Sequence, residues 1–299
     1  MDPKVLNKIS RLELRARLVV EGFLSGRHRS PYHGVSVEFA EHREYVPGDD
    51  LRHLDWKVFG KTDRYYIKRY EEETSLTCQI VVDGSASMQY AGERGVSKFD
   101  YAATAASALA YLILRQQDFV GLALFDEKVR SFVPPSNNPA HLLAITHELS
   151  GASDQPKTDI GMVLAEIATR IRQRGMVILI SDLFDDPEKI LQGLKKLRAK
   201  QMDIVVFHVL DDEEIHFPLQ RMYRFEGMES ALRLTADPRA LRAEYLKIFE
   251  TFTDTMRRGC LRQGIDYSLV NTSHLLDVVL TAFLATRAGG IAGRRKGRG

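Results

Sequence analysis

The 299-residue chain has little cysteine and no large excess of either charge. Its two cysteines, Cys78 and Cys260, are too few for a disulfide scaffold or a zinc cluster, which favours a reducing compartment. Lys and Arg number 42 against 40 Asp and Glu, so the charge of +2 gives no general reason to expect nucleic-acid binding. A content of 44% hydrophobic and 27% charged residues is close to the average of soluble proteins, which excludes a mostly disordered, collagen-like or coiled-coil chain.

The sequence also lacks a long hydrophobic run. The longest uncharged, apolar-rich stretch, residues 101–114, includes Thr104 and Ser107 and has the length of a core helix rather than of a membrane span. Charged residues interrupt the N-terminal region before an apolar stretch can form, so we expect no signal peptide. These features predict a cytoplasmic protein without a transmembrane segment.

By composition, the chain divides into an N-terminal region, a central domain and a tail. Residues 1–75 are expected to form a helix, from apolar positions at helical spacing over 5–24, and then a small strand-rich block. We interpret the helix as packed on the rest of the protein, with a membrane-surface helix as the alternative. Residues 289–299 are rich in Gly and Arg and are expected to be a disordered, solvated terminus; contact with nucleic acid or a membrane surface is the alternative.

The central region, residues 76–288, alternates between strand and helix patterns. Strands are predicted at 76–82, 119–125, 176–180, 203–210 and 265–270, and helices at 98–117, from 138, 159–174, from 186, 237–262 and 274–285. Several of the strands are apolar on both faces, which is typical of a mostly parallel sheet covered by helices on both sides. We therefore predict a doubly wound α/β domain with an excursion at residues 211–236.

Polar side chains follow two of the predicted strands, and a third polar segment precedes the helix between them. These candidate ligands are Asp83, Ser85, Ser87, Thr158 and Asp182. Ligands of open parallel sheets bind beyond the carboxyl ends of the strands, so we expect these side chains to converge. Two carboxylates and three hydroxyls form a hard-oxygen set that suits Mg²⁺, with Mn²⁺ or Ca²⁺ as alternatives, and argues against zinc. Each residue also has a simpler interpretation as a turn residue or a helix cap.

Three of these segments carry a resemblance to a known family. Asp83-Gly-Ser-Ala-Ser87 resembles the Asp-x-Ser-x-Ser motif of von Willebrand factor type A domains, and the segments at Thr158 and Asp182 resemble that family's threonine and second aspartate loops. The resemblance covers residues 76–288. It implies a metal-ion-dependent adhesion site, in which Mg²⁺ accepts a Glu or Asp carboxylate from a partner protein. Lys157 departs from the Gly that often precedes the Thr, and the adjacent Asp159 is a competing ligand.

A second signature lies upstream, between Glu44 and Trp56. Its distinctive positions are Tyr45, Gly48, Asp49, Asp50, Arg52, Asp55 and Trp56. The segment resembles the bacterial "domain of unknown function 58" family, whose members couple such a block to a von Willebrand type A-like domain. That resemblance implies a MoxR-type AAA+ ATPase as a partner. From its residues alone, the block is either a loop clamped onto the sheet domain or a direct binding element.

Taken together, the motifs predict a non-enzymatic, metal-dependent interaction module, an adaptor that works with an AAA+ ATPase in complex assembly or maturation. The alternative is a phosphatase-like metal-dependent hydrolase with Asp83 as nucleophile. Against it, Ser85 replaces the second carboxylate of the Asp-x-Asp pattern. The sequence also has no P-loop, Gly-x-Ser-x-Gly or His-x-x-Glu-His motif.

Overall fold

The computed structural model of the protein contains two compact units. It describes residues 11–26, 41–46, 56–62, 64–69, 75–93, 95–151, 159–219, 223–226, 233–277, 279–281 and 283–284. The chain up to Gly26 and from Leu76 onward forms the larger unit, and Arg27–Ser75 forms the smaller one. The helix α2 (Leu12–Gly26) therefore groups with the sheet domain and not with the block that follows it.

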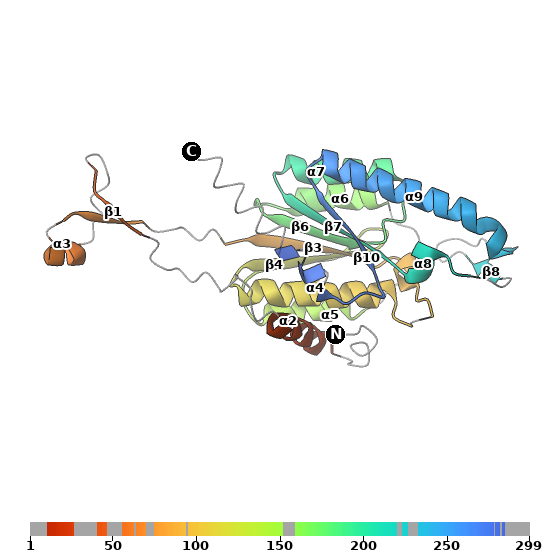
Figure 1. Ribbon diagram of the computed structural model, residues 1–299, viewed down its shortest axis with the longest axis horizontal. Coiled ribbons are helices and arrows are strands. Elements are labelled where there is room, and N and C mark those ends of the chain that lie inside the picture. The colour runs from red at the N-terminus through yellow and green to blue at the C-terminus, as the bar shows by residue number, and fades with distance from the viewer. Residues whose placement is uncertain are drawn as a thin grey trace. The chain divides into compact units, whose positions relative to one another are not determined.

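A six-stranded sheet is the centre of the larger unit (Figure 1). Its strands, in spatial order, are β10 (Asp266–Asn271), β7 (Asp203–Leu210), β6 (Met176–Ser181), β3 (Thr77–Asp83), β4 (Phe119–Phe125) and β5 (Val129–Ser136). All neighbours run parallel except β5, which is antiparallel to β4. Counted from β3 along the chain, the order is 3-2-1-4-5-6, the doubly wound arrangement. The predicted α/β class with a mostly parallel sheet is confirmed.

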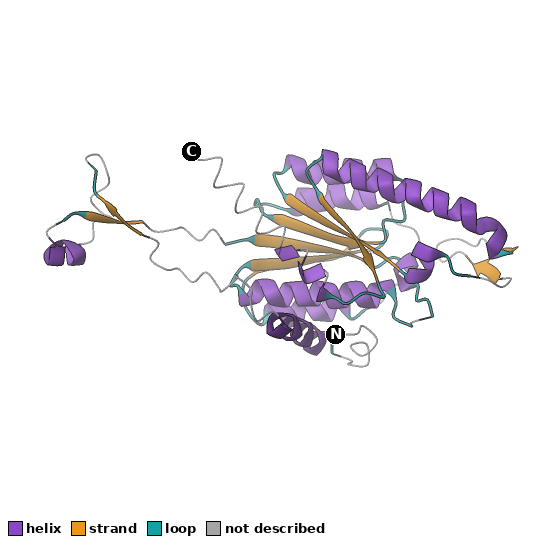
Figure 2. Cartoon of the chain, viewed as in Figure 1, coloured by secondary structure: helices purple, strands orange, loops and turns teal. Residues whose placement is uncertain are grey.

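Helices cover both faces of this sheet (Figure 2). One face carries α4 (Lys98–Arg115), α5 (His141–Leu149) and the helical residues 277–284 as far as they are described, and α2 lies outside α4. The other face carries α6 (Ile160–Arg170), α7 (Pro187–Ala199) and α9 (Pro238–Arg262). Each face buries its own apolar cluster, as expected for parallel strands that are apolar on both sides. In the described part of the chain, no helix is both long and apolar enough to span a membrane.

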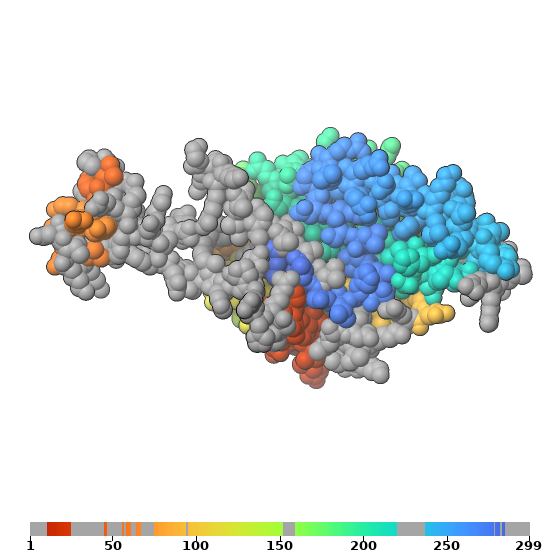
Figure 3. All heavy atoms as spheres, viewed as in Figure 1, coloured from red at the N-terminus to blue at the C-terminus, as the bar shows by residue number. Residues whose placement is uncertain are grey.

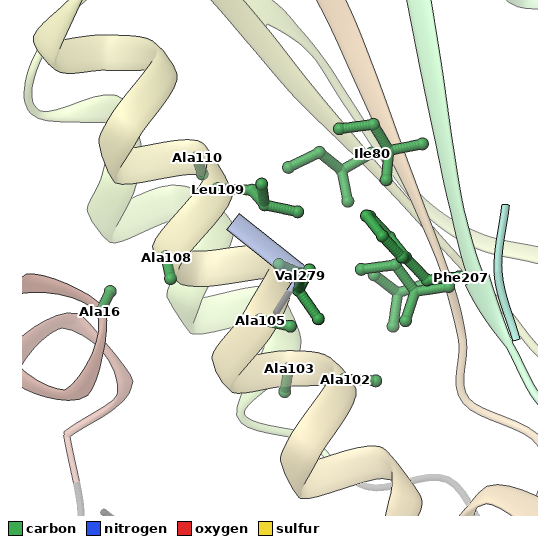
Figure 4. Packing of buried hydrophobic residues seen from close by; sticks show 14 of the residues in the cluster. Ala16, Ile80, Ala102, Ala103, Ala105, Ala108, Leu109, Ala110, Phe207 and Val279 are labelled. Carbon is green, nitrogen blue, oxygen red and sulfur yellow. The ribbon is translucent and has the colours of Figure 1, made fainter. Parts of the chain in front are cut away.

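Small side chains allow α4 to pack between the sheet and α2. The helix begins after Ser97, whose hydroxyl accepts a hydrogen bond from the Asp100 backbone N–H. A run of buried alanines follows, and Figure 4 shows Leu109 on the side of α4 that faces Ile80 and Phe207 of the sheet. The buried residues of α2 join the same cluster. The interpretation of the N-terminal helix as packed on the protein is thus confirmed.

Several elements differ from the sequence prediction. The strand β5 was not predicted, because Pro134 and Pro135 lie within it; prolines are tolerated there since β5 is an edge strand. The helix α5 begins at His141 rather than at residue 138, and α6 ends at Arg170 rather than at residue 174. The predicted excursion begins with a short helix, α8 (Asp212–His216), followed by the antiparallel pair β8 (Tyr223–Glu226) and β9 (Arg233–Ala236). The tail at 289–299 lies outside the described residues.

Candidate functional site

The candidate site lies where the connections of the sheet diverge. The chain leaves β3 toward β4 on one side, whereas β6, the other neighbour of β3, leads to β7 on the opposite side. Such a switch point opens a crevice beyond the carboxyl ends of the two strands, where ligands of doubly wound folds bind. Asp83 ends β3, and Asp182 follows directly after β6. The two predicted carboxylates therefore stand at the switch point.

The loop after β3 brings together the first three predicted residues. Asp83 Oδ1 accepts a hydrogen bond of 2.9 Å from the Ser85 backbone N–H, which closes a tight turn. The hydroxyl oxygens of Ser85 and Ser87 lie 3.2 Å apart. All three residues are buried, and the 3-10 helix that follows, Ala86–Gln89, holds the loop in place. This part of the predicted oxygen set converges.

Asp182 joins the same group from β6. The Ser87 side chain interacts with its carboxylate and helps to lower the pKa of Asp182. Asp182 Oδ1 also accepts from the Phe184 backbone N–H at 3.2 Å. Ser181, one residue earlier, donates its hydroxyl to Asp83 Oδ2 at 2.5 Å. Serine hydroxyls thus lie between the two strand ends and contact their carboxylates.

The threonine loop is described only at its end. Thr158 lies outside the described residues, so its place in the ligand set stays a prediction. Asp159, the competing ligand, caps α6 by accepting from the Met162 N–H at 3.0 Å and pairs with Lys189 Nζ at 3.1 Å. Ile160 N donates to Asp185 Oδ2 at 2.9 Å, so this loop is tied to the one after β6. The bonds of Asp159 give it a role as a cap.

The two carboxylates are both buried, but their pKa values are shifted in opposite directions. Burial raises the pKa of Asp83 to about 7, helped by the nearby negative charge of Asp182. For Asp182, burial alone would also raise the pKa, but the Lys98 ammonium overcomes this and holds the pKa below its ordinary value. The donors to Asp83 in the described part of the chain are hydroxyl and amide groups, none of them charged. Asp83 is therefore a buried carboxylate without a cation of its own there.

Two buried residues at the site were not predicted from the sequence. Lys98, the first residue of α4, places Nζ 2.7 Å from Asp182 Oδ2. His208 of β7 has Nε2 2.8 Å from the Asp182 backbone oxygen and Nδ1 2.6 Å from the Tyr267 hydroxyl. Burial lowers the pKa of His208 to about 4, so the ring is neutral. Lys98 lies in the first turn of α4, where the helix dipole is positive and a lysine is unfavourable. That mismatch was the only feature of the sequence that could have pointed to Lys98.

The upstream signature belongs to the smaller unit. There β1 (Glu41–Glu44) pairs antiparallel with β2 (Tyr66–Arg69), and α3 (Trp56–Thr62) lies between them in sequence. The Tyr45 ring meets Tyr65 edge-on, with centroids 6.2 Å apart, and Phe59 stacks on Tyr65 at 4.5 Å. Trp56 is 65% exposed. The other signature positions, Gly48, Asp49, Asp50, Arg52 and Asp55, lie outside the described residues.

Comparison with known proteins identifies the family. Residues 41–251, more than half of the chain, match the family described as "Protein of unknown function DUF58". The chain belongs to the DUF58 family. This DUF58 protein is 27% identical to the uncharacterized protein Mb1516 of Mycobacterium bovis over 305 residues, covering 98% of this chain and 93% of the relative. The same values hold for the uncharacterized protein Rv1480 of Mycobacterium tuberculosis.

Two solved structures are similar to this DUF58 protein at low sequence identity. The conserved hypothetical protein BatB from Bacteroides thetaiotaomicron has a TM-score of 0.48 and 16% identity, covering 72% of this chain and all of BatB. The VWA domain of SpRpn10 has a TM-score of 0.40 and 13% identity, covering 69% of this chain and 94% of that domain.

The residues of the DUF58 site fit a hard divalent cation. Asp83 is buried, none of its donors among the described residues is charged, and the Ser85 and Ser87 hydroxyls lie beside it. Oxygen ligands of this kind suit Mg²⁺. Among the described residues no group of three or more His, Cys, Asp or Glu could hold a metal, so a cation here would depend on the serine hydroxyls. That is the chemistry of the predicted Asp-x-Ser-x-Ser set.

Proposed function

We propose that this DUF58 protein is a non-enzymatic interaction module that binds other proteins through a divalent metal ion. The expected ion is Mg²⁺. The metal would be held by Asp83, Ser85, Ser87 and Asp182, with Thr158 as the fifth predicted member. When bound, it would supply a positive centre that accepts a carboxylate from the partner. The observation that carries the proposal is Asp83, which is 1% exposed at the switch point and bonded to uncharged donors.

Exposed apolar side chains on both loops beside the site support a protein as the ligand. Phe184, two residues after Asp182, is 67% exposed, and Met162, in the first turn of α6, is 72% exposed. The hydrogen bond from Ile160 N to Asp185 Oδ2 keeps these two loops together. Aromatic residues and Met are enriched at protein interfaces relative to the rest of the surface. We therefore propose a partner that presents an acidic side chain next to apolar ones.

We further propose a MoxR-type AAA+ ATPase as a working partner, in complex assembly or maturation in the cytoplasm. The support for the ATPase is the resemblance carried by the signature from Tyr45 to Trp56. The support for the compartment is that Cys78 and Cys260 are both buried and form no disulfide. Co-purification of the ATPase with the tagged full-length protein tests the partnership.

The metal-dependent function is tested by capture of partners from a lysate of the source cells. Full-length protein is immobilised in Mg²⁺, in EDTA, and as Asp83→Asn in Mg²⁺, and the retained proteins are identified by mass spectrometry. We expect partners that are held only by the wild type in Mg²⁺. The matched control is Asp203→Asn, the same change in the first residue of β7. This residue lies at the amino-terminal end of the parallel strands, away from the site, so the variant should retain the same partners.

Two outcomes would contradict this proposal. Equal capture in all samples would show that the partners bind at a surface that does not include Asp83. Turnover of a generic phosphoester by the wild type, lost in Asp83→Asn, would favour the hydrolase instead. Against that alternative, Ser85 stands where the Asp-x-Asp pattern of aspartyl-phosphate enzymes has its second carboxylate.

A further inference from the structure

A buried lysine lies inside the candidate site. Lys98 is 2% exposed, and its Nζ is 2.7 Å from Asp182 Oδ2 and 2.7 Å from Glu214 Oε1. The ring of Tyr90 lies 5.9 Å from the same nitrogen. Burial alone would lower the pKa of Lys98, but the two carboxylates raise it above its ordinary value, so the side chain is a permanent cation.

Glu214, the second partner of Lys98, is itself held firmly. Its Oε2 accepts from the Asp211 backbone N–H at 2.8 Å, which completes the capping box of α8. The neighbouring Glu213 accepts from the Tyr90 hydroxyl at 2.6 Å and from the Glu93 N–H at 2.9 Å. Tyr245 of α9 donates to the Glu214 backbone oxygen at 2.7 Å, and Figure 3 shows α8 and α9 side by side at the surface. Lys98 is thus fixed between Asp182 and an anchored glutamate.

This arrangement places a fixed positive charge on one of the proposed metal ligands. The carboxylates of Asp182 and Glu214 share the one Lys98 ammonium, and Asp83 adds a further carboxyl group, so negative charge is in excess at the site. A divalent cation is attracted by that excess, but it must approach Asp182 against the charge of Lys98. Two charges a few ångströms apart interact strongly in a partly buried site, so the effect of the lysine on metal binding is large.

We infer that Lys98 competes with the metal ion for Asp182 and thereby weakens metal binding at this site. The inference rests on the proposed metal-binding function. It makes Lys98 a residue that sets the affinity of the site rather than a ligand. Removing the ammonium frees Asp182 for the metal, whereas removing the charge of Glu214 leaves Lys98 bound to Asp182 alone.

The test measures Mn²⁺ binding to the full-length protein from the electron paramagnetic resonance signal of the free ion, with Mg²⁺ as competitor. We expect Lys98→Met to bind Mn²⁺ about tenfold or more tightly than the wild type, and Glu214→Gln to bind it about threefold or more weakly. The matched control is Lys200→Met, the same change at an exposed position at the end of α7, which should leave binding unchanged. Circular dichroism establishes that each variant is folded.

The opposite signs separate competition from structural damage, because damage to the site weakens binding in both variants. Binding by Lys98→Met where the wild type binds nothing would support the inference in its strongest form. Equal or weaker binding by folded Lys98→Met overturns it, while wild-type binding that is lost in Asp83→Asn leaves the proposed function standing. If Lys98→Met does not fold, Glu214→Gln decides: unchanged or tighter binding overturns the inference, and weaker binding by the folded variant supports it. Absence of binding in the wild type and in Lys98→Met overturns both proposals.

Discussion

Ser181 donates its hydroxyl to Asp83, and this bond joins the last residue of β6 to the last residue of β3. The same oxygen accepts from the Leu183 backbone N–H at 2.9 Å. Leu183 has φ 54°, in the left-handed region, and its side chain is fully buried. One serine therefore both positions the carboxylate and holds the turn that carries Asp182.

Replacing Ser181 should destabilise the protein even without metal. Ser181→Ala removes a donor from Asp83 and an acceptor from Leu183 N, and both are buried. A buried polar group without a partner costs about 1–3 kcal/mol, and we expect a loss of that size in the free energy of unfolding. Urea denaturation in EDTA measures it. Ser131→Ala, in the edge strand β5, is the control; an equal effect at both positions would show that the Ser181 bonds contribute nothing special.

The hydrogen bonds of His208 determine its tautomer. The Asp182 carbonyl can only accept, so Nε2 carries the proton, and Nδ1 must accept from the Tyr267 hydroxyl. We predict that the ¹⁵N spectrum shows His208 as the neutral Nε2–H form; protonation at Nδ1 would contradict this hydrogen-bond network. Tyr267→Phe leaves the buried Nδ1 without its donor, and we expect it to lower the free energy of unfolding by about 1–2 kcal/mol.

The parts of the site that follow from local sequence were predicted, and the parts that depend on distant contacts were not. Asp83 and Asp182 could be placed because each follows an apolar strand, and parallel strands bring their carboxyl ends to one edge. Lys98 appeared only as the first residue of a helix, since its partners lie 84 and 116 residues away in sequence. Glu214 lay in an acidic segment interpreted as an excursion, yet α8 returns it to the site.

The same distinction explains why the edge strand β5 was not predicted from the sequence. The central strands are apolar on both faces and stand out in the sequence, whereas β5 has only partly buried or exposed residues and contains Pro134 and Pro135. Among the described strands, β4 is its one neighbour in the sheet. A strand at an edge needs no second set of ladder hydrogen bonds, so sequence rules that exclude proline from strands fail there.

An exposed position outside the site offers a stabilising substitution. Gln201 follows the end of α7 with φ 60°, a conformation that favours glycine because a side chain there is crowded by the backbone. We expect Gln201→Gly to raise the free energy of unfolding by about 0.5–1 kcal/mol, after the greater freedom of glycine in the unfolded chain is subtracted. The control Lys200→Gly, at φ −80°, should destabilise. Urea denaturation compares both with the wild type, and stabilisation by both would refute the backbone explanation.

Metal removal tests the site through stability. A ligand that binds only the folded state at 100 times its Kd adds about 2.7 kcal/mol, so Mg²⁺ should raise the Tm of the wild type and EDTA should reverse the rise. Asp83→Asn should abolish the shift, because the variant lacks the central negative ligand.

In EDTA the same variant should be at least as stable as the wild type. The substitution removes a buried carboxylate with no charged donor among the described residues, and the Ser181 hydroxyl can accept from the new amide. Asp203→Asn should keep the full shift. A Mg²⁺ shift retained in Asp83→Asn would place the metal elsewhere, and a much lower stability in EDTA would mean that Asp83 serves the fold itself.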